Sequence, residues 1–415
     1  MARRSRTPVK IYRVGGSVRD ELLGRRIVDR DWVVVGATPE ILVASGYKPV
    51  GRDFPVFLHP ETREEYALAR TERKHGRGYR GFEFFVSPDV TLDEDLARRD
   101  LTLNAMARDE HGSLIDPFGG EADLRAGILR HVSPAFVEDP LRVLRVARFA
   151  ARFGFKVARE TLALMRELAE SGELSSLAPE RVWQELARGL MEPHPSRMIE
   201  VLRDCGALAH LLPEIDARIG SRTGRRSKRG ADTRLAAALD LAATRGAALP
   251  VRYAILACDT GENESSATAA RGAEAARNAR TADAISSRLK APADCRDAAR
   301  LSARWLRTVD NAGELRPAQL LALLNAADAF RRPERIESLL EVCACFALSV
   351  PRAPAEYVPA AIVRAALAAA KGVDAGAIAR RVARGGDAER AADDDAIARA
   401  IRVARLTALR GIQTR

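Results

Sequence analysis

The hydrophobic pattern of this 415-residue chain changes once, near Leu92, and that change constrains the fold more than any other feature. Before it, strand-like and helix-like stretches alternate: KIYRV at 10–14, a helix that Gly24 ends, the strand DRDWVVVG, and the strands FPVFLH and EEYALAR joined by a turn at PETR. After it, apolar residues recur three and four positions apart, which is the helical period. The pattern predicts an α+β protein, with a small mixed-sheet unit followed by all-α domains.

Two segments rich in basic residues and glycine interrupt these patterns. The first, TERKHGRGYRG between Thr71 and Gly81, has no periodicity and is predicted to be a mobile loop that closes over an anion. The second, RIGSRTGRRSKRGA at 218–231, follows the first run of helices and is predicted to be a linker or an RNA-facing loop. The expected domains are a flexible basic arm (1–9), a head (10–137), a helical neck and body (138–217), a basic linker (218–230) and a helical tail (231–415).

The charge of the chain favours a polyanionic partner. Lys and Arg number 67 against 56 Asp and Glu, a net charge of +11, so nucleic acid is the first expectation. Aromatic residues make up only 5% of the chain, which argues for phosphate contacts and against extended base-stacking platforms. No apolar run is long enough to span a bilayer, and no apolar segment follows the Arg-rich start as it would in a signal peptide. We therefore expect a cytoplasmic protein.

Cysteine and histidine restrict the metal chemistry of the chain. The five cysteines form no CxxC pair and are predicted to be reduced structural thiols. All six histidines lie at or before His210, so the rest of the chain contains no imidazole metal ligand.

Asp29 and Asp31 stand one residue apart at the start of an apolar strand. In a strand, such residues face the same side about 6.6 Å apart, a spacing that suits two shared Mg²⁺ ions. Taken alone, the DRD segment favours the simpler interpretation, a polar strand start with solvated charges. Upstream, Gly15, Gly16 and Ser17 separate a strand from a helix N-terminus, where backbone N–H groups attract phosphate. The combination is far more specific than either motif, because a lone GG pair is most often just a tight turn.

The chain resembles bacterial class II tRNA nucleotidyltransferases, the CCA-adding enzymes. The resemblance is dense from residue 10 to about 216 and thin beyond. It rests on motifs that occur in this order: VGGSVRDELLG, DRDWVVVG, VGRDFPVFLH, EEYALARTERK, RRDLTLNAMA, IDPFGG and EDPLRVLRVARFAARFG. It implies a head like that of DNA polymerase β, followed by neck, body and tail domains that hold the tRNA acceptor arm.

The resemblance also implies roles for individual residues. It gives Asp29 and Asp31 to catalysis and Mg²⁺ binding, and Gly16 and Arg19 to the nucleotide. In RRDLTLNA, it places Arg99 at the nucleotide and Asp100 and Asn104 near its ribose. From periodicity alone, that segment could be an ordinary amphipathic helix with solvated arginines. Glu65, on a neighbouring strand, is a possible third carboxylate whose role stays open.

A second constellation, EDPLRVLRVARF, places polar residues at every third position: Asp139, Arg142, Arg145 and Arg148. On an isolated helix, Asp139 would be the cap before Pro140 and the arginines a solvated face. The resemblance implies instead an amino-acid template that pairs with the incoming base. Cytosine and adenine each present an amine donor beside an unprotonated ring nitrogen, so a carboxylate can accept from the first while a guanidinium donates to the second. Uracil and guanine invert that pattern and would leave desolvated groups unpaired.

The second half departs from the family. Many bacterial relatives carry a phosphohydrolase domain there, built on His and Asp metal ligands. Here the nearest counterpart is Cys258-Asp259, and no histidine follows. We expect a helical tail that descends from such a domain without its metal ligands.

The sequence therefore predicts stepwise addition of C, C and A to the 3′ end of tRNA from CTP and ATP, by a monomer that uses Mg²⁺. Two alternatives stay open. One is a specialised CC-adding or A-adding enzyme, or a poly(A) polymerase, of the same family. The other is a non-catalytic tRNA-binding protein, although clustered carboxylates beside RNA phosphate would not help a binder.

Overall fold

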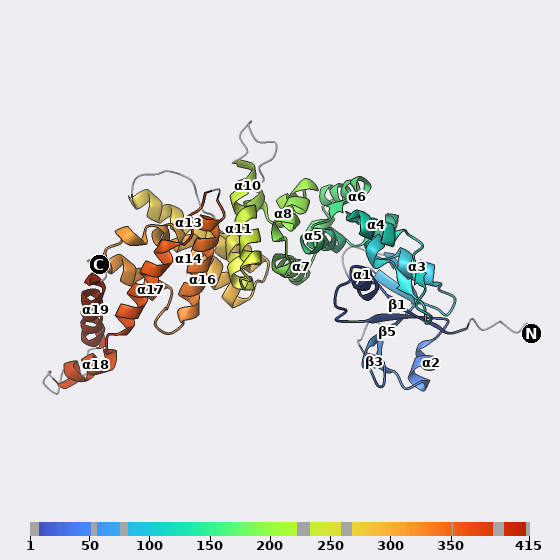
Figure 1. The fold of residues 1–415 in the computed structure, drawn as a ribbon, viewed down its shortest axis with the longest axis horizontal. Coiled ribbons are helices and arrows are strands. Elements are labelled where there is room, and N and C mark those ends of the chain that lie inside the picture. Colours follow the sequence, from blue (N-terminus) through green and yellow to red (C-terminus); the bar gives the residue numbers. More distant parts are fainter. Residues whose placement is uncertain are drawn as a thin grey trace, which may run out of the picture. The chain divides into compact units, whose positions relative to one another are not determined.

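The computed structural model describes residues 8–50, 56–74, 82–221, 233–258, 268–350, 352–384 and 394–411. The chain divides into two compact units, Met1–Asp216 and Ala217–Arg415. The first contains the strands, whereas the described residues of the second form helices and turns without a strand (Figure 1). This confirms the predicted α+β class.

The sheet of the first unit has seven strands in the order β3-β4-β5-β2-β1-β8-β9. Its strands β2 and β5 are parallel and its other neighbouring pairs are antiparallel. The bounds are β1 Lys10–Val14, β2 Asp31–Val35, β3 Lys48–Val50, β4 Val56–Leu58, β5 Glu65–Leu68, β8 Ala107–Arg108 and β9 Leu114–Ile115. The sequence placed β1, β4 and β5 correctly, together with the turn between β4 and β5.

Alternating residues of the strands build a core on each side of the sheet. Val33 and Val35 of β2 pack with Leu92 and Leu96 of helix α3 (Leu92–Ala97). Val34 faces the opposite side, in a second cluster that includes Leu42 of helix α2 (Pro39–Ala44). Because a strand presents successive side chains to opposite faces, the continuous run WVVV can serve both cores.

Three sequence expectations about this unit are wrong in detail. Strand β2 begins at Asp31, so Asp29 lies before it rather than on it. The segment expected to be a loop begins as strand β6 (Arg70–Lys74), which pairs with β7 (Phe82–Val86), and residues 75–81 lie outside the described residues. The helix expected through RRDLTLNAMA ends at Ala97, and a 3₁₀ turn, η2, follows at Thr102–Asn104.

Backbone bonds to other segments explain that early helix end. Leu101 is extended and forms an isolated bridge with His131, and the N–H of Thr102 donates to Arg130 O at 2.9 Å. Gly120 lets helix α4 (Gly120–Ala126) approach the 3₁₀ turn, since a Cβ there would lie 2.2 Å from Thr102 O. The polar side chains from Arg98 to Asn104 are thus fixed outside a regular helix.

The rest of the first unit is helical apart from β10 (Ile128–Leu129), which pairs with β11 (Lys156–Val157). Helix α5 packs against both α7 and α8. The remaining elements are a 3₁₀ turn η3 Pro134–Glu138, α5 Leu141–Phe153, α6 Arg159–Glu170, η4 Glu173–Ser176, α7 Pro179–Met191, α8 Pro195–Asp204, α9 Ala207–Leu211 and, at the start of the unit, α1 Gly16–Leu22. Helix α10 (Pro213–Ser221) begins in the first unit and ends in the second.

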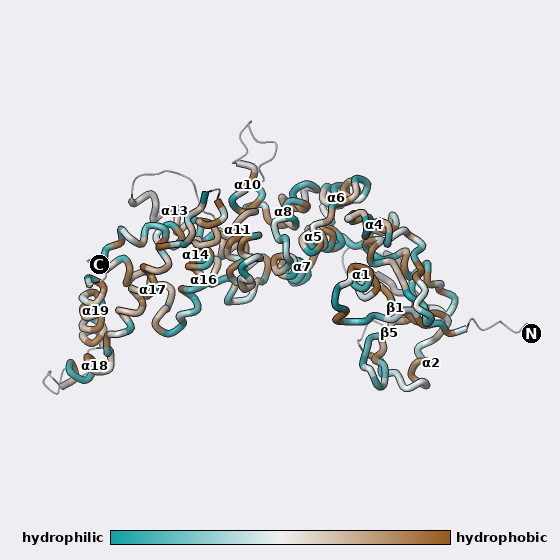
Figure 2. The backbone as a smooth tube through the Cα atoms, viewed as in Figure 1, coloured by the Kyte–Doolittle hydropathy of each residue, from teal (hydrophilic) through white to brown (hydrophobic). Residues whose placement is uncertain are grey.

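The second unit has its own apolar core, which includes the fully buried Tyr253 and all of its cysteines. Hydrophobic and hydrophilic stretches alternate along its helices (Figure 2). Within the described residues, no helix is long and apolar enough to cross a membrane. The elements are α11 Thr233–Thr244, α12 Leu249–Ala257, α13 Thr268–Arg288, α14 Ala293–Asp310, η5 Ala312–Glu314, α15 Pro317–Ala326, α16 Pro333–Leu348, α17 Val358–Lys371, α18 Ala375–Arg384 and α19 Asp394–Arg410.

Candidate active site

A cavity of about 500 Å³ lies in the first unit between the sheet and helix α5. Its wall is formed by the turn between β1 and α1, the starts of β2 and β5, the segment Arg98–Asn104, and one side of α5. Every site residue predicted from the sequence lines this cavity except Asp29. The structure therefore brings together motifs that lie more than a hundred positions apart in the chain.

The glycine turn holds Arg19 against the floor of the cavity. Gly15 has φ 68°, a conformation that favours glycine, and its N–H donates to Met106 O at 3.1 Å. Arg19 is only 4% exposed; its guanidinium donates to Asn104 Oδ1 at 2.5 Å and to Asp20, and lies 5.4 Å from the centre of the Phe149 ring. Arg19 is thus a fixed cation at the side of the glycine turn.

Two carboxylates lie side by side at one edge of the cavity. Asp31 and Glu65 are register partners on the parallel strands β2 and β5, and both line the cavity. The start of β2 is fixed from Trp32, whose Nε1 donates to Glu64 at 2.9 Å and whose ring stacks on Tyr66. Partial desolvation raises the pKa of Asp31, with Asp29 adding to the rise and Arg99 opposing it. Glu65, whose role the sequence left open, therefore lies beside Asp31.

This edge fits Mg²⁺. Within the described parts of the chain, no three His, Cys, Asp or Glu side chains converge closely enough to hold a metal ion. Mg²⁺, however, usually takes only one or two carboxylates and completes its shell with water and substrate phosphate. Asp31 and Glu65 form no ion pair among the described residues, so their oxygens are available as hard ligands. Asp29, exposed in the preceding loop, would have to turn inward to join them.

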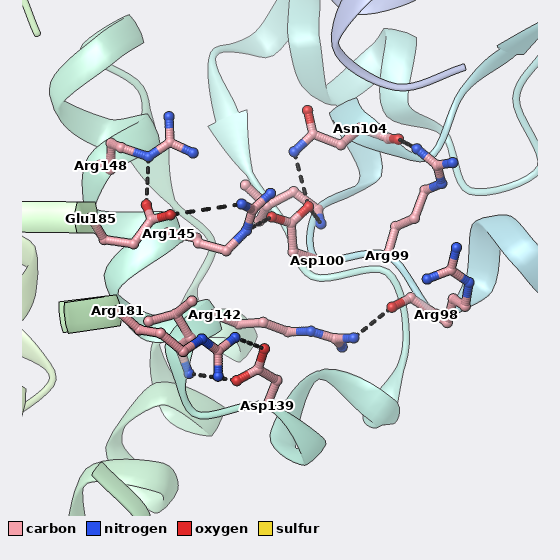
Figure 3. A network of polar contacts seen from close by, with 12 residues as sticks. Arg98, Arg99, Asp100, Asn104, Asp139, Arg142, Arg145, Arg148, Arg181 and Glu185 are labelled. Carbon is pink, nitrogen blue, oxygen red and sulfur yellow. Dashed lines mark hydrogen bonds and ion pairs between the residues drawn. The ribbon is translucent and has the colours of Figure 1, made fainter. Parts of the chain in front are cut away.

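A chain of polar contacts connects the segment Arg98–Asn104 to helices α5 and α7 (Figure 3). Asp100 accepts from Asn104 Nδ2 at 2.9 Å and from Arg145 Nε at 2.7 Å. Burial alone would raise the pKa of Asp100, but the charge of Arg145 and these hydrogen bonds hold it well below its usual value. Glu185 on α7 continues the chain and accepts from Arg148 Nε at 2.6 Å. Arg145 and Arg148 of α5 are therefore held by buried carboxylates.

The predicted base-selecting pair is also held by protein groups. Asp139 accepts from the Leu141 N–H at 3.0 Å and from Arg181 at 3.1 Å. Arg142 is 7% exposed and donates to the carbonyls of Ala135 and Arg98, at 2.8 and 2.6 Å (Figure 3). A carboxylate has further lone pairs and a guanidinium further N–H groups, so both residues keep hydrogen-bonding capacity toward a base. Burial excludes the solvated-face interpretation for Arg142 and Arg148, whereas Asp139 does accept from the first N–H of α5, that of Leu141.

Two acidic residues of the site were missed in the sequence. Asp95 is fully buried and pairs with Arg98 and Arg99 at 2.8 and 3.2 Å. Glu185 is 4% exposed on the face of α7 that also buries Val182 and Leu186. A charge on the apolar face of an amphipathic helix needs a buried partner, and that signal would have indicated Glu185.

We expect Glu185→Ala to destabilise the first unit by about 3 kcal/mol, because it removes the hydrogen-bonded carboxylate of the buried Arg148 guanidinium and leaves only Glu192, at 3.9 Å. Urea unfolding measures the change. The exposed Glu167→Ala on α6 is the matched control and should change stability by less than about 0.5 kcal/mol. An effect of Glu185→Ala no larger than that of the control would show that the Arg148–Glu185 pair does not stabilise the first unit.

The lowered pKa of Asp100 predicts a pH dependence. A carboxyl whose pKa is depressed by folding stabilises the folded state above its unfolded pKa and loses that contribution as pH falls toward its folded pKa. The wild type should therefore lose more stability than Asp100→Asn between about pH 5 and about pH 3. Urea unfolding of both proteins at each pH tests this, and equal losses would contradict it.

Comparisons with known proteins agree with this geometry. Residues 11–130 match the family described as "Poly A polymerase head domain", and residues 154–219 match "Probable RNA and SrmB- binding site of polymerase A". The chain is 56% identical to a "Multifunctional CCA protein" of Azoarcus sp. (strain BH72), over 90% of this chain and 92% of that protein. A protein of the same name from Nitrosospira multiformis is 53% identical, over 91% and 92% of the two chains.

Solved structures show the same fold. The Bacillus stearothermophilus CCA-adding enzyme in complex with CTP matches with a TM-score of 0.63 and 25% identity, over 97% of this chain and 89% of that one. The Thermotoga maritima CCA-adding enzyme complexed with tRNA_CCA matches with a TM-score of 0.61 at 21% identity, over 97% and 88%. With a shared head, a shared RNA-binding segment and more than half of the aligned residues identical to those of both relatives, this chain belongs to the bacterial class II CCA-adding tRNA nucleotidyltransferases.

Proposed function

We propose that this chain adds C, C and A in turn to the 3′ end of tRNA, taking CTP and ATP and releasing pyrophosphate. The observation that carries the proposal is the single cavity that holds Asp31, the Gly15-Gly16 turn and the pair Asp139 and Arg142. A carboxylate edge, a phosphate turn and a base-recognising pair are the parts that nucleotidyl transfer without a nucleic-acid template requires.

Each group of residues has its own role in the proposed reaction. Asp31 and Glu65, with Asp29 if it turns inward, would hold Mg²⁺, which when bound stabilises charge on the reacting phosphate oxygens. The turn at Gly16, beside the fixed cation of Arg19, receives the triphosphate. The 3′ hydroxyl of the tRNA then attacks the α-phosphate, a new phosphodiester bond forms, and the bond to pyrophosphate breaks. Arg99, which lies between Asp95 and the Asn104 carbonyl, supplies a positioned cation near the nucleotide.

Base choice comes from the opposite wall of the cavity. Asp139 accepts from the exocyclic amine of cytosine or adenine, and Arg142 donates to the adjacent ring nitrogen. Their protein partners fix both groups in place before a nucleotide binds. Asp100 and Asn104, bonded to each other, would contact the ribose, and Arg145 and Arg148 support this wall.

Incubation of the purified protein with labelled CTP, Mg²⁺ and tRNA that lacks its tail tests the proposal. We expect labelled CMP at the tRNA 3′ end and no incorporation after chelation of the metal. Binding of tRNA without any incorporation would favour the non-catalytic alternative.

We further infer that the chain acts in the cytoplasm as a monomer. Every residue of the proposed site comes from the first unit of one chain, so the site needs no second copy. Light scattering at the concentration used for the activity assay measures the oligomeric state, and activity confined to a dimer would contradict the inference of a monomer.

The tail gives a negative prediction. Neutral imidazole is a principal ligand of divalent metal in His-Asp sites, but no histidine follows His210. Cys258, at the position of the expected imidazole, is a buried thiol, which prefers softer metals. We therefore expect no hydrolysis of 2′,3′-cyclic AMP with added Ni²⁺, Mg²⁺ or Mn²⁺ while CCA addition proceeds. Metal-dependent hydrolysis that persists in Asp31→Ala would contradict this reading of the tail.

A further inference from the structure

A second hollow, of about 400 Å³, lies entirely in the second unit, between helices α13, α14, α15 and α16. Its size falls within the range of small-ligand sites. Its floor is apolar, with Ala276, Ala279, Leu301 and Ala326, and the half-buried ring of Trp305 lies beside them.

Arginines dominate the polar wall. The hollow is lined by Arg280, Arg300, Arg304 and Arg335, against the single lining acid Asp283. Guanidinium groups recognise phosphate through paired hydrogen bonds, so such a wall favours a phosphate-bearing ligand.

The positive charge is only partly balanced within the protein. Arg300 and Arg335 share one carboxylate, Asp297, at 3.1 and 3.5 Å. Arg280 and Arg304 are exposed and form no ion pair with any described residue. The Nε of Arg335 is buried without an acceptor among the described residues. Two free guanidinium groups thus face the hollow together with a third whose donors are not all used.

Trp305 adds a surface for a planar ring. The guanidinium carbon of Arg304 lies 6.0 Å from the centre of the Trp305 ring. An indole face next to a cation stacks well with a nucleobase, and the arginines can then hold the attached phosphate. We propose that this hollow binds one phosphorylated nucleoside unit, with its base on Trp305 and its phosphate on Arg280 and Arg304. The ligand is either a nucleotide of the bound RNA or a free nucleotide; the RNA source rests on the proposed function.

The first test compares two double variants that remove the same charge. Arg280→Ala with Arg304→Ala removes the free cations of the hollow, whereas Arg277→Ala with Arg296→Ala removes two exposed cations of the same two helices outside it. We expect the first to weaken binding of tail-less tRNA by roughly tenfold. The slope of the logarithm of the association constant against the logarithm of salt concentration should become shallower by about 1 to 2. The second should bind like the wild type. Equal affinities of the two double variants, for tail-less tRNA and for CMP alike, would overturn the role of the arginines.

The second test follows tryptophan fluorescence and distinguishes the two sources. The full-length protein and Trp305→Phe are titrated with CMP and, separately, with tail-less tRNA. A change that requires Trp305 and is caused by tRNA alone identifies a nucleotide of the RNA, and one also caused by CMP identifies a free nucleotide. No Trp305-dependent change with either ligand would overturn the stacking. Both tests measure binding only. A failure to incorporate CMP would therefore refute the proposed function without changing what these binding results mean.

Discussion

Asp31→Ala is expected to lower CMP incorporation at least about 100-fold, equivalent to about 2.7 kcal/mol of transition-state stabilisation. Asp31 is the predicted metal ligand that both lines the cavity and begins strand β2. Binding of tRNA should stay close to that of the wild type, because a loss of negative charge does not remove any Lys or Arg contact to phosphate. Single-turnover incorporation and a filter-binding titration measure the two quantities.

Two further variants sharpen this result. Glu61→Ala removes an exposed carboxylate from the turn before β5 and should leave the rate unchanged. Glu65→Gln tests the neighbour of Asp31 and should lower the rate if Glu65 contributes to the metal edge. Near wild-type incorporation by Asp31→Ala would refute the assignment of the metal edge.

The second large effect concerns base choice. Arg142→Ala should reduce discrimination against UTP and GTP as well as the overall rate, since it removes the donor directed at the ring nitrogen. Losing one such buried hydrogen bond costs about 1 to 3 kcal/mol, or roughly 5- to 150-fold in discrimination. Competition between CTP and UTP in single-nucleotide incorporation measures the ratio.

Arg142 also donates to the carbonyls of Ala135 and Arg98, so its loss could slow the reaction by loosening that segment alone. Arg181→Ala provides the matched control, because it removes a protein partner of Asp139 without removing a predicted donor to the base. It should retain most of the nucleotide preference. If Arg142→Ala lost rate with its preference intact, Arg142 would be a structural residue and not part of the template.

The elements that were predicted correctly are those whose structure depends on residues close together in the sequence. The strands at Lys10–Val14 and Glu65–Leu68 follow from β-rich runs bounded by turns, and α5 follows from its helical period. The end of α3 at Ala97 could not be predicted in this way. It depends on the bridge between Leu101 and His131 and on the bond from Thr102 to Arg130, which are contacts across about thirty positions of the chain.

The candidate site shows the same limit. Asp31, Gly16 and the residues of α5 could be found because their motifs are local. The partners that fix them were not visible, since Glu185 lies 37 positions after Arg148 and Arg145 lies 45 after Asp100. The placement of Asp29 on the strand was wrong for a different reason. The alternation argument assumed that the strand includes Asp29, whereas β2 begins two residues later, at Asp31.

The central claim is that one cavity carries out all three additions. Sequencing the 3′ ends of tRNA that began at the discriminator base, after incubation with CTP and ATP separately and together, tests it directly. We predict two C residues with CTP alone, the complete CCA tail with both nucleotides, and no further growth. A tail that stops at CC when ATP is present, no addition unless the tRNA is supplied already ending in CC, or a run of A residues would contradict the claim.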